Sequence, residues 1–212
     1  FGTVNKSKMV CSGTLQTNYN CTQQKPIPVA IKVLNPPGED QTMNKLNKED
    51  FINEAVIMAT LQLGTTSQQK ISPNVVRFLA WVPSPEMICL EFCDMGSLDK
   101  QLETLYVKYL NNKSDTPISV IQYMIDVAKG MAHVHSKGIV HLDLAARNIL
   151  ISKGTAKVSD FGMSKVLNNG KYIFTGGKQP WMTLPPELAV EVENDGEAHD
   201  VWSFGVAMWE TM

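Results

Sequence analysis

Apolar and polar residues follow one another along the chain in patterns typical of strands and helices. Four segments have the pattern of β-strands or of a β-hairpin: residues 27–34, 75–81, 87–92 and 149–159. Four others have the pattern of helices: residues 47–63, 98–110, 116–137 and 200–212. Polar segments with Pro, Gly and Asn separate them and are predicted to be loops, including the long segment 163–186.

The first predicted helix carries a charged residue on its apolar side. Phe51, Ala55 and Met58 form a stripe, and Asn47 is the predicted N-cap. Glu54 falls on the same stripe. Because a buried carboxylate without a partner is strongly destabilising, Glu54 must either reach solvent at the edge of the helix or pair with a cation.

The third and fourth predicted helices differ in how their apolar residues are arranged. The third ends before Gly138, a predicted C-cap, and has one stripe made of Ile121, Met124, Ile125, Ala128, Met131, Ala132 and His135. The fourth is apolar on nearly every side, which predicts a buried helix with Asp200 as a candidate cap. The chain begins at Phe1 and stops within this apolar pattern, so we expect it to be a fragment of a longer protein.

Composition narrows the class of protein. The chain has 212 residues, of which 43% are hydrophobic and 19% charged, as in ordinary globular domains. A net charge of −2 gives no reason to expect nucleic acid or a membrane surface as a partner. No run of apolar residues is long enough to span a bilayer. The four cysteines lack the spacing of a zinc site or a disulfide framework, which suits a reducing compartment.

Candidate catalytic side chains are concentrated in residues 141–148, His-Leu-Asp-Leu-Ala-Ala-Arg-Asn. Asp143 is able to accept a proton, and Asn148 and Asp160 offer the hard oxygen ligands that Mg²⁺ prefers. Asp160 begins the segment Asp-Phe-Gly, so the two loops flank one predicted hairpin. Turns whose Asp and Asn side chains only cap the backbone would explain either loop alone, but not both at such short range.

These two loops resemble the catalytic loop, H-R-D-L-x-x-x-N, and the metal-binding loop, D-F-G, of protein kinases. Ala145, Ala146 and Arg147 are similar to the tyrosine-kinase form of the catalytic loop. Leu142 departs from the family pattern, which has Arg at that place.

Two further segments extend the resemblance toward the beginning of the chain. Residues 29–32, Val-Ala-Ile-Lys, are similar to the kinase V-A-I-K motif. A lysine between apolar neighbours on a strand often has no such role and only extends its ammonium group into solvent. Residues 1–4, Phe-Gly-Thr-Val, are similar to the end of the glycine-rich loop and equally compatible with a simple strand. The resemblance supplies Lys32 as the cationic partner of Glu54.

The resemblance covers nearly the whole chain and implies a fold. This is an α+β, two-lobed protein kinase-like fold with a small β-rich N-lobe and a mainly α-helical C-lobe whose C-terminal helices are missing. It implies a partial kinase domain over residues 1–212, with the N-lobe in 1–92, the hinge in 93–96 and the truncated C-lobe in 97–212.

The resemblance also implies site residues for phosphoryl transfer from ATP with Mg²⁺. The implied catalytic residues are Asp143, Lys32, Glu54 and Arg147, and the implied Mg²⁺ ligands are Asn148 and Asp160. Asp143 would take the proton of the acceptor hydroxyl, Arg147 would help to place the acceptor, and Lys32 would anchor the phosphates. Besides Lys32, the residues implied to border the nucleotide are Gly2, Val4, Ala30, Leu90, Glu91, Cys93 and Leu150.

The function implied is ATP-dependent phosphorylation of tyrosine in protein substrates, in the cytoplasm or in the cytoplasmic part of a membrane receptor. Two other functions stay open. A serine/threonine kinase is disfavoured by residues 145–147 and by the length of the loop after Asp160. A pseudokinase that binds nucleotide as a signalling scaffold is favoured by Leu142 and by the absence of the first two glycines of the glycine-rich loop. It is also favoured by Thr183, because tyrosine kinases normally have a Trp three residues before the Pro-Glu pair, here residues 186 and 187.

Tyr172 is the candidate regulatory residue. It lies within the long predicted loop after Asp160, where we expect it to be accessible and phosphorylated. An added phosphate orders a loop when Arg is there to meet it. Because Leu142 replaces that Arg, we expect phosphorylation of Tyr172 to activate only weakly.

Overall fold

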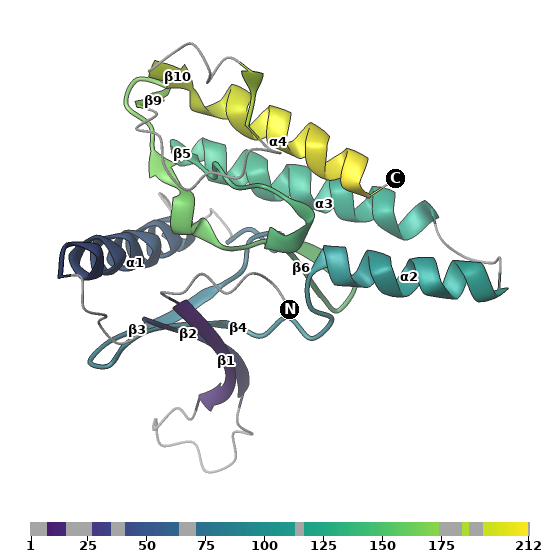
Figure 1. The fold of residues 1–212 in the computed structure, drawn as a ribbon, viewed down its shortest axis with the longest axis horizontal. Coiled ribbons are helices and arrows are strands. Elements are labelled where there is room, and N and C mark those ends of the chain that lie inside the picture. Colours follow the sequence, from purple (N-terminus) through teal and green to yellow (C-terminus); the bar gives the residue numbers. More distant parts are fainter. Residues whose placement is uncertain are drawn as a thin grey trace.

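The computed structural model describes residues 8–15, 27–34, 41–63, 71–112, 117–173, 184–186 and 193–211. It has a β-rich part and a mainly helical part (Figure 1). The β-rich part is an antiparallel sheet with strand order β1-β2-β4-β3 and one helix, α1. The bounds are Lys8–Leu15 for β1, Ile27–Leu34 for β2, Phe78–Pro83 for β3, Glu86–Glu91 for β4 and Gln41–Gln62 for α1.

Among the described residues, the second part contains three helices and several short strand pairs. The helices are α2 (Leu98–Asn112), α3 (Pro117–Ser136) and α4 (Gly196–Glu210). The antiparallel pairs are β5 (Ile139–Val140) with β8 (Lys165–Val166), β6 (Ile149–Ser152) with β7 (Thr155–Val158), and β9 (Lys171–Ile173) with β10 (Glu193–Asp195). Two 3₁₀ turns, Ala146–Asn148 and Phe161–Met163, carry the candidate catalytic loops.

One apolar core joins α1 to the second part. Ile57, Met58 and Leu61 of α1 pack with buried residues of α3 and of the β6–β7 hairpin. The predicted stripe on α1 is confirmed, because Phe51, Ala55 and Met58 are all buried. This shared core fixes α1 relative to the hairpin, and therefore fixes Glu54 relative to the loops at either end of that hairpin.

The predicted hairpin and the helix end before it are confirmed by backbone geometry. Lys153 and Gly154 both have positive φ, at 50° and 76°, as a two-residue turn between antiparallel strands requires. Gly138 follows α3 with φ of 65°, the left-handed conformation of a C-cap glycine.

Two boundaries near the beginning differ from the prediction. β1 was not predicted, and it is held by continuous pairing with β2 from Lys8 opposite Leu34 to Leu15 opposite Ile27. Helix α1 begins at Gln41, so Asn47 is not its N-cap. Residues 45–50 of this helix are mostly exposed and carry charged contacts, such as Lys48 with Glu86. Exposed helix turns of this kind leave no hydrophobic pattern to detect.

The predicted stripe of helix α3 is only partly its buried side, since Met124 and Met131 of that stripe are buried. Ile121 and Ile125 are 62% and 44% exposed, whereas Tyr123, Val127 and Val134 are buried. The helix has apolar residues on both sides, so periodicity alone identifies two candidate faces and does not choose between them.

Helix α4 is neither capped nor buried as predicted. Its N-cap is Asp195, whose Oδ1 accepts from the backbone N–H groups of Glu197 and Ala198 at 3.0 and 3.1 Å. Four large apolar residues are exposed: Val201 at 66%, Trp202 at 45%, Met208 at 40% and Trp209 at 69%. The buried side instead consists of His199, Asp200, Ser203 and Ala207, which are polar or small. Hydrophobicity alone could not identify such an inner face.

We expect the exposed face of α4 to cause self-association of a protein made of these 212 residues. The double substitution Trp202→Gln with Trp209→Gln should shift the association to several-fold higher protein concentration. Size-exclusion chromatography with light scattering measures this. Tyr106→Gln, at a 65% exposed aromatic residue on α2, is the matched control and should change little. A wild-type protein that stays monomeric at every concentration would contradict the prediction.

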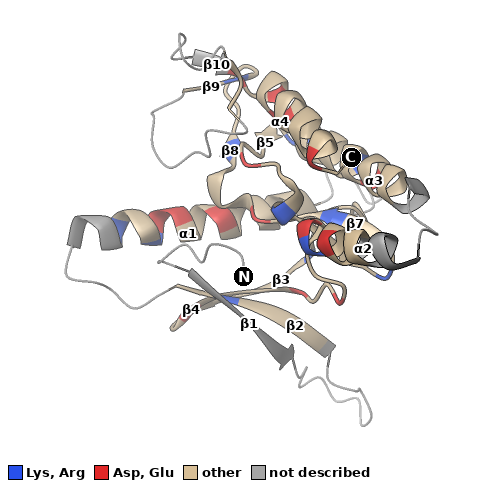
Figure 2. Ribbon diagram, turned by 45° about the vertical axis from the view of Figure 1, so that its right-hand side comes forward, with Lys and Arg blue, Asp and Glu red and all other residues tan. Residues whose placement is uncertain are grey.

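Acidic and basic residues are interspersed over the described elements (Figure 2). None of the helices among the described residues is both long and apolar enough to cross a membrane.

Candidate active site

Lys32 forms the centre of a charged network between the sheet and the second part. It lies on β2 and is 7% exposed. Its ammonium pairs with the carboxylate of Glu54 on α1 and donates to Oδ1 of Asp160 at 2.7 Å. Three residues that lie far apart in sequence are therefore brought together, and the ion pair expected for Glu54 is present.

The charge balance of this network favours a charged Lys32. Burial alone lowers the pKa of Lys32, but the carboxylates of Glu54 and Asp160 more than offset burial, so the pKa lies above its ordinary value. A permanently charged ammonium at this place attracts anionic groups. Two carboxylates around one ammonium also leave the network able to accept a further cation.

Asp160 is held in an unusual backbone conformation. Its φ and ψ are 60° and 73°, the left-handed region, which is unfavourable for a residue with a side chain. Phe161, the next residue, is fully buried and anchors the 3₁₀ turn in the core, where the turn contacts α1. The side chain of Asp160 is nevertheless 47% exposed. The turn thus directs one carboxylate outward from a rigid base, as is typical of functional sites.

The carboxylate of Asp143 is held through both of its oxygens. Arg147 Nη2 donates to Oδ1, and Asn148 Nδ2 donates to Oδ2 at 2.8 Å. Asn148 Nδ2 also donates to the main-chain oxygen of Asp143 at 2.7 Å. Arg147 and Asn148 both belong to the 3₁₀ turn Ala146–Asn148, so this turn sets the orientation of the Asp143 side chain.

The environment of Asp143 favours proton uptake. Burial raises the pKa of Asp143, and the charge of Arg147 and the hydrogen bond from Asn148 oppose this shift without cancelling it. A carboxylate with a raised pKa that remains partly accessible is a better proton acceptor than a free one. Asp143 is thus suited to act as a general base.

The buried side chain of Asp200 on α4 holds the backbone of the loop that contains Asp143. Its Oδ2 accepts from the N–H of His141 and its Oδ1 from the N–H of Leu142, both at 2.8 Å. Leu142 has φ of 64°, so Asp200 stabilises a left-handed backbone at this place. His135 Nε2 also donates to Asp200 Oδ2, at 2.8 Å. Asp200 therefore contacts the catalytic loop and is not the helix cap predicted from the sequence.

His135 makes the stability of this support dependent on pH. Burial lowers the pKa of His135, but the hydrogen bond and charge of Asp200, with smaller effects of Glu197 and Asp195, raise it above its ordinary value. A raised pKa in the folded state means that the contribution to stability is full below about pH 6.5, the unfolded value, and is lost as pH rises through the folded pKa.

We therefore expect the free energy of unfolding to fall with rising pH above about 6.5, and His135→Gln to flatten this dependence. Urea unfolding at a series of pH values measures this. The quantity compared is the free energy of unfolding of the wild type minus that of the variant at each pH. His133→Gln is the control, because His133 lies on the same helix and contacts the carbonyl of Leu61 rather than a carboxylate. The same slope in wild type and His135→Gln would exclude His135 as the cause.

Sequence comparisons agree with this geometry. Residues 1–212 match the family model described as protein tyrosine and serine/threonine kinase. The chain belongs to the protein kinase family. It is 35% identical over 209 residues to "Ephrin type-A receptor 5" of Gallus gallus, an alignment covering 96% of this chain and 18% of that protein. The values are the same for "Ephrin type-A receptor 8" of Homo sapiens. For the Mus musculus receptor 8 they are 34% over 213 residues, covering 98% and 19%.

The chain thus spans about a fifth of the length of these three relatives. The family explains why the β-rich part, the helical part and the two loops occur together in one chain.

The residues implied to border a nucleotide are partly described. Ala30 and Leu90 lie directly opposite each other on β2 and β4. Cys93 is buried, and burial raises the pKa of its thiol to about 12, so the thiol stays neutral and unreactive. Leu150 is half-buried on β6, against the main core. Gly2 and Val4 lie outside the described residues.

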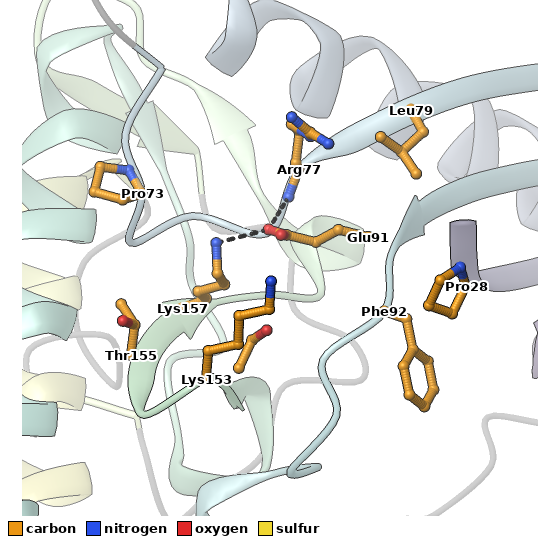
Figure 3. Close-up of a pocket in the computed structure, with 10 residues that line it drawn as sticks. Pro28, Pro73, Arg77, Leu79, Glu91, Phe92, Lys153, Thr155 and Lys157 are labelled. Carbon is orange, nitrogen blue, oxygen red and sulfur yellow. Dashed lines mark hydrogen bonds and ion pairs between the residues drawn. The ribbon is translucent and has the colours of Figure 1, made fainter. Parts of the chain in front are cut away.

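Glu91 uses its side chain in a way that sequence reasoning missed. Its Oε1 accepts from the backbone N–H of Arg77 at 2.7 Å and from Lys157 Nζ at 2.9 Å (Figure 3). These contacts border a surface pocket of about 440 Å³. Glu91 therefore links the sheet to β7. Lys157 lies 66 residues away in sequence, and nothing in the local pattern indicates this pairing.

Asn148 and Asp160 have the chemistry of a Mg²⁺ site. Among the described residues, no group of three or more His, Cys, Asp or Glu forms a metal centre. Mg²⁺ does not need one, since it binds through one or two protein oxygens together with phosphates and water. Asn148 uses its amide nitrogen on Asp143, which leaves its amide oxygen as a ligand, and the Asp160 carboxylate is half-exposed. The two residues therefore fit Mg²⁺.

Tyr172 is buried, so the expectation of an accessible phosphorylation site was wrong. It is 4% exposed on β9, and its hydroxyl is hydrogen-bonded to Nδ1 of His199 over 2.7 Å. The segment predicted as one loop contains β8 and β9, and β9 pairs with β10. A phosphate cannot be added to Tyr172 in this position unless the strand first leaves its site.

Leu142 has a packing role that its place in the motif did not suggest. It is fully buried with Val140 and Tyr172, against which Met163, Leu167 and Leu184 also pack. We call these six residues the Leu142 cluster. The cluster holds the described residues after Asp160 through apolar contacts, where the family pattern has a charged side chain.

Proposed function

We propose that this chain is the catalytic part of a protein tyrosine kinase, which transfers the γ-phosphoryl group of ATP to tyrosine hydroxyls of proteins. The observation that carries the proposal is the carboxylate of Asp143, fixed through both oxygens by Arg147 and Asn148. Phosphoryl transfer depends mainly on positioning and charge stabilisation. A partly accessible carboxylate held this firmly meets the first requirement for the acceptor.

In the proposed reaction Asp143 takes the proton of the tyrosine hydroxyl. The phenolic oxygen forms a bond to the γ-phosphorus while the bond from that phosphorus to the β–γ bridging oxygen breaks. The bridging oxygen keeps the electron pair and leaves as part of ADP. The raised pKa of Asp143 suits proton uptake, and the guanidinium of Arg147 keeps the carboxylate directed toward the acceptor.

Lys32 is the proposed phosphate anchor. It is charged, and Glu54 of α1 holds its ammonium group. In the structure it donates to Asp160, and bound phosphates would share or replace that contact. When bound, Mg²⁺ neutralises charge on the phosphates, and Asn148 and Asp160 would hold it.

One observation supports tyrosine as the acceptor, and another bears on where the chain acts. Residues 145–147, Ala-Ala-Arg, are similar to the tyrosine-kinase form of the catalytic loop. The relatives are named ephrin receptors, and we extend this to the proposal that the chain acts as the cytoplasmic part of a receptor. Protein substrates that present tyrosine, together with ATP, are the proposed partners.

The test is phosphorylation of matched peptides by the purified full-length protein with ATP and Mg²⁺. We expect ³²P transfer to a tyrosine peptide and at least tenfold less to the same peptide with serine, with Lys32→Met as the inactive control. Transfer to serine would indicate a serine/threonine kinase. Nucleotide binding without transfer would indicate a scaffold.

A further inference from the structure

The 3₁₀ turn Ala146–Asn148 lacks a cap from its own sequence. Ala145, which precedes the turn, has an extended backbone and no side chain able to accept a hydrogen bond. The N–H groups at the start of a helical turn need acceptors when they are shielded from water. The turn carries Arg147 and Asn148, which hold Asp143, so its support bears directly on the site.

Glu210 supplies the missing acceptor from another helix. Its Oε2 accepts from the backbone N–H of Ala146 at 3.1 Å, across 64 residues of sequence. Within the described part of the chain, no Lys, Arg or His lies within ion-pair distance of the Glu210 carboxylate. The bond to Ala146 is therefore not a by-product of an ion pair nearby.

The position of Glu210 in its own helix also calls for an explanation. It is the last residue of α4, where the partial negative charge of the helix end makes an acidic side chain unfavourable. Helix stability thus gives no reason for an acid here. The contact with the turn does.

We propose that Glu210 is a positioning residue for the phosphoryl transfer. It holds the N–H of Ala146 and so fixes the turn on which Arg147 and Asn148 stand. Through these two side chains it sets the direction of the Asp143 carboxylate. Glu210 and Asp200 then support the catalytic loop at two points from one helix, one through Ala146 and the other through His141 and Leu142. The inference rests on the proposed function.

The first test compares Glu210→Ala with Glu210→Gln in the full-length protein. Alanine removes the acceptor, whereas glutamine keeps an uncharged oxygen that is able to accept from Ala146. Replacing a residue that orients the ligands of a metal site typically changes affinity or activity about 10- to 100-fold, and Asn148 of this turn is an implied ligand of that kind. We expect kcat to fall about tenfold in Glu210→Ala and less than threefold in Glu210→Gln. The KM for ATP should stay within about twofold in both, because Lys32 and its partners are untouched.

The matched control is Glu103→Ala, which removes an exposed acid from α2. It should leave kcat and KM unchanged. Either variant could contain less folded protein than the wild type. Each rate is therefore divided by the concentration of active sites, measured by titration with a tight nucleotide analogue. An unchanged kcat in Glu210→Ala, or equal losses in both variants, would overturn the positioning role.

The second test does not depend on activity. Hydrogen–deuterium exchange of a peptide containing Ala146 reports whether its N–H keeps an acceptor. We expect exchange about tenfold faster in Glu210→Ala and near the wild-type rate in Glu210→Gln. Equal protection in all three proteins would overturn the inference. If the wild-type protein transfers no phosphate, the proposed function fails, and this exchange experiment still decides whether Glu210 positions the turn.

Discussion

Replacing Asp143 by Asn should lower kcat by about 10²- to 10⁴-fold, the usual contribution of a general base. Asparagine has the same shape but cannot take the proton of the tyrosine hydroxyl. The KM for ATP should change less than about twofold, because Lys32 and Asp160 are untouched. Steady-state kinetics with a tyrosine peptide measures both values.

The same substitution should not destabilise the fold. The raised pKa of Asp143 means that its ionised form is disfavoured in the folded protein, despite the contacts from Arg147 and Asn148. A neutral Asn avoids this cost and keeps an oxygen to accept one of the two hydrogen bonds. We expect the melting temperature to be equal or higher. Glu103→Gln on α2 is the control for loss of an exposed carboxylate and should retain full activity. Turnover of Asp143→Asn within twofold of wild type would rule out the general-base role.

The parts of the site that are set by local sequence were predictable. Residues 141–148 and 160–162 supply their side chains from short turns beside one hairpin, and the hairpin itself has a clear pattern. Physical argument left Glu54 either at solvent or paired with a cation, and the motif resemblance supplied Lys32 as the partner that the structure confirms. Their catalytic roles stay a prediction.

The parts set by long-range contacts were not predictable. β1 is a strand because β2 pairs with it, and α3 buries one of two similar apolar sides because the hairpin lies there. On α4 the buried residues are polar or small, and two acidic residues of this helix form hydrogen bonds to a distant loop. Asp200 and Glu210 show this, since their partners lie about 60 residues away. A pattern of hydrophobicity contains no record of such partners.

Tyr172 is the clearest error of prediction, and its cause is physical. A polar segment with several glycines and asparagines was predicted to be an exposed loop, and Tyr172 within it to be accessible. The structure instead pairs the segment with β5 and β10 and buries the tyrosine beside Leu142. Leu142 was considered only for the charge it lacks. The motif did not predict that Leu142 would instead pack against apolar residues and stabilise this region.

Introducing the family residue with Leu142→Arg should therefore destabilise the protein rather than restore regulation. Leu142 is fully buried in the Leu142 cluster, and the described cluster residues offer no carboxylate to a guanidinium. A buried charge without a partner costs about 3–5 kcal/mol, a large part of the total stability of a domain. Leu142→Ala should cost about 2–5 kcal/mol through the cavity it leaves. Leu142→Met keeps the volume and should cost less than about 1.5 kcal/mol. Urea unfolding of the three variants measures this order.

The same packing makes Tyr172 a poor phosphate acceptor in the folded protein. Its hydroxyl is occupied by His199, and a phosphate would bring about −1.5 to −2 charges into the Leu142 cluster. We expect little phosphate on Tyr172 in the wild type and several-fold more in Leu142→Ala, where β9 is held less tightly. Site-resolved mass spectrometry after incubation with ATP and an added tyrosine kinase measures both, so the result does not depend on the chain's own activity. The Leu142→Met variant is the control and should resemble the wild type. If Leu142→Arg is as stable as the wild type and accepts phosphate readily at Tyr172, the cluster does not hold this segment and the charged arrangement of the family applies here too.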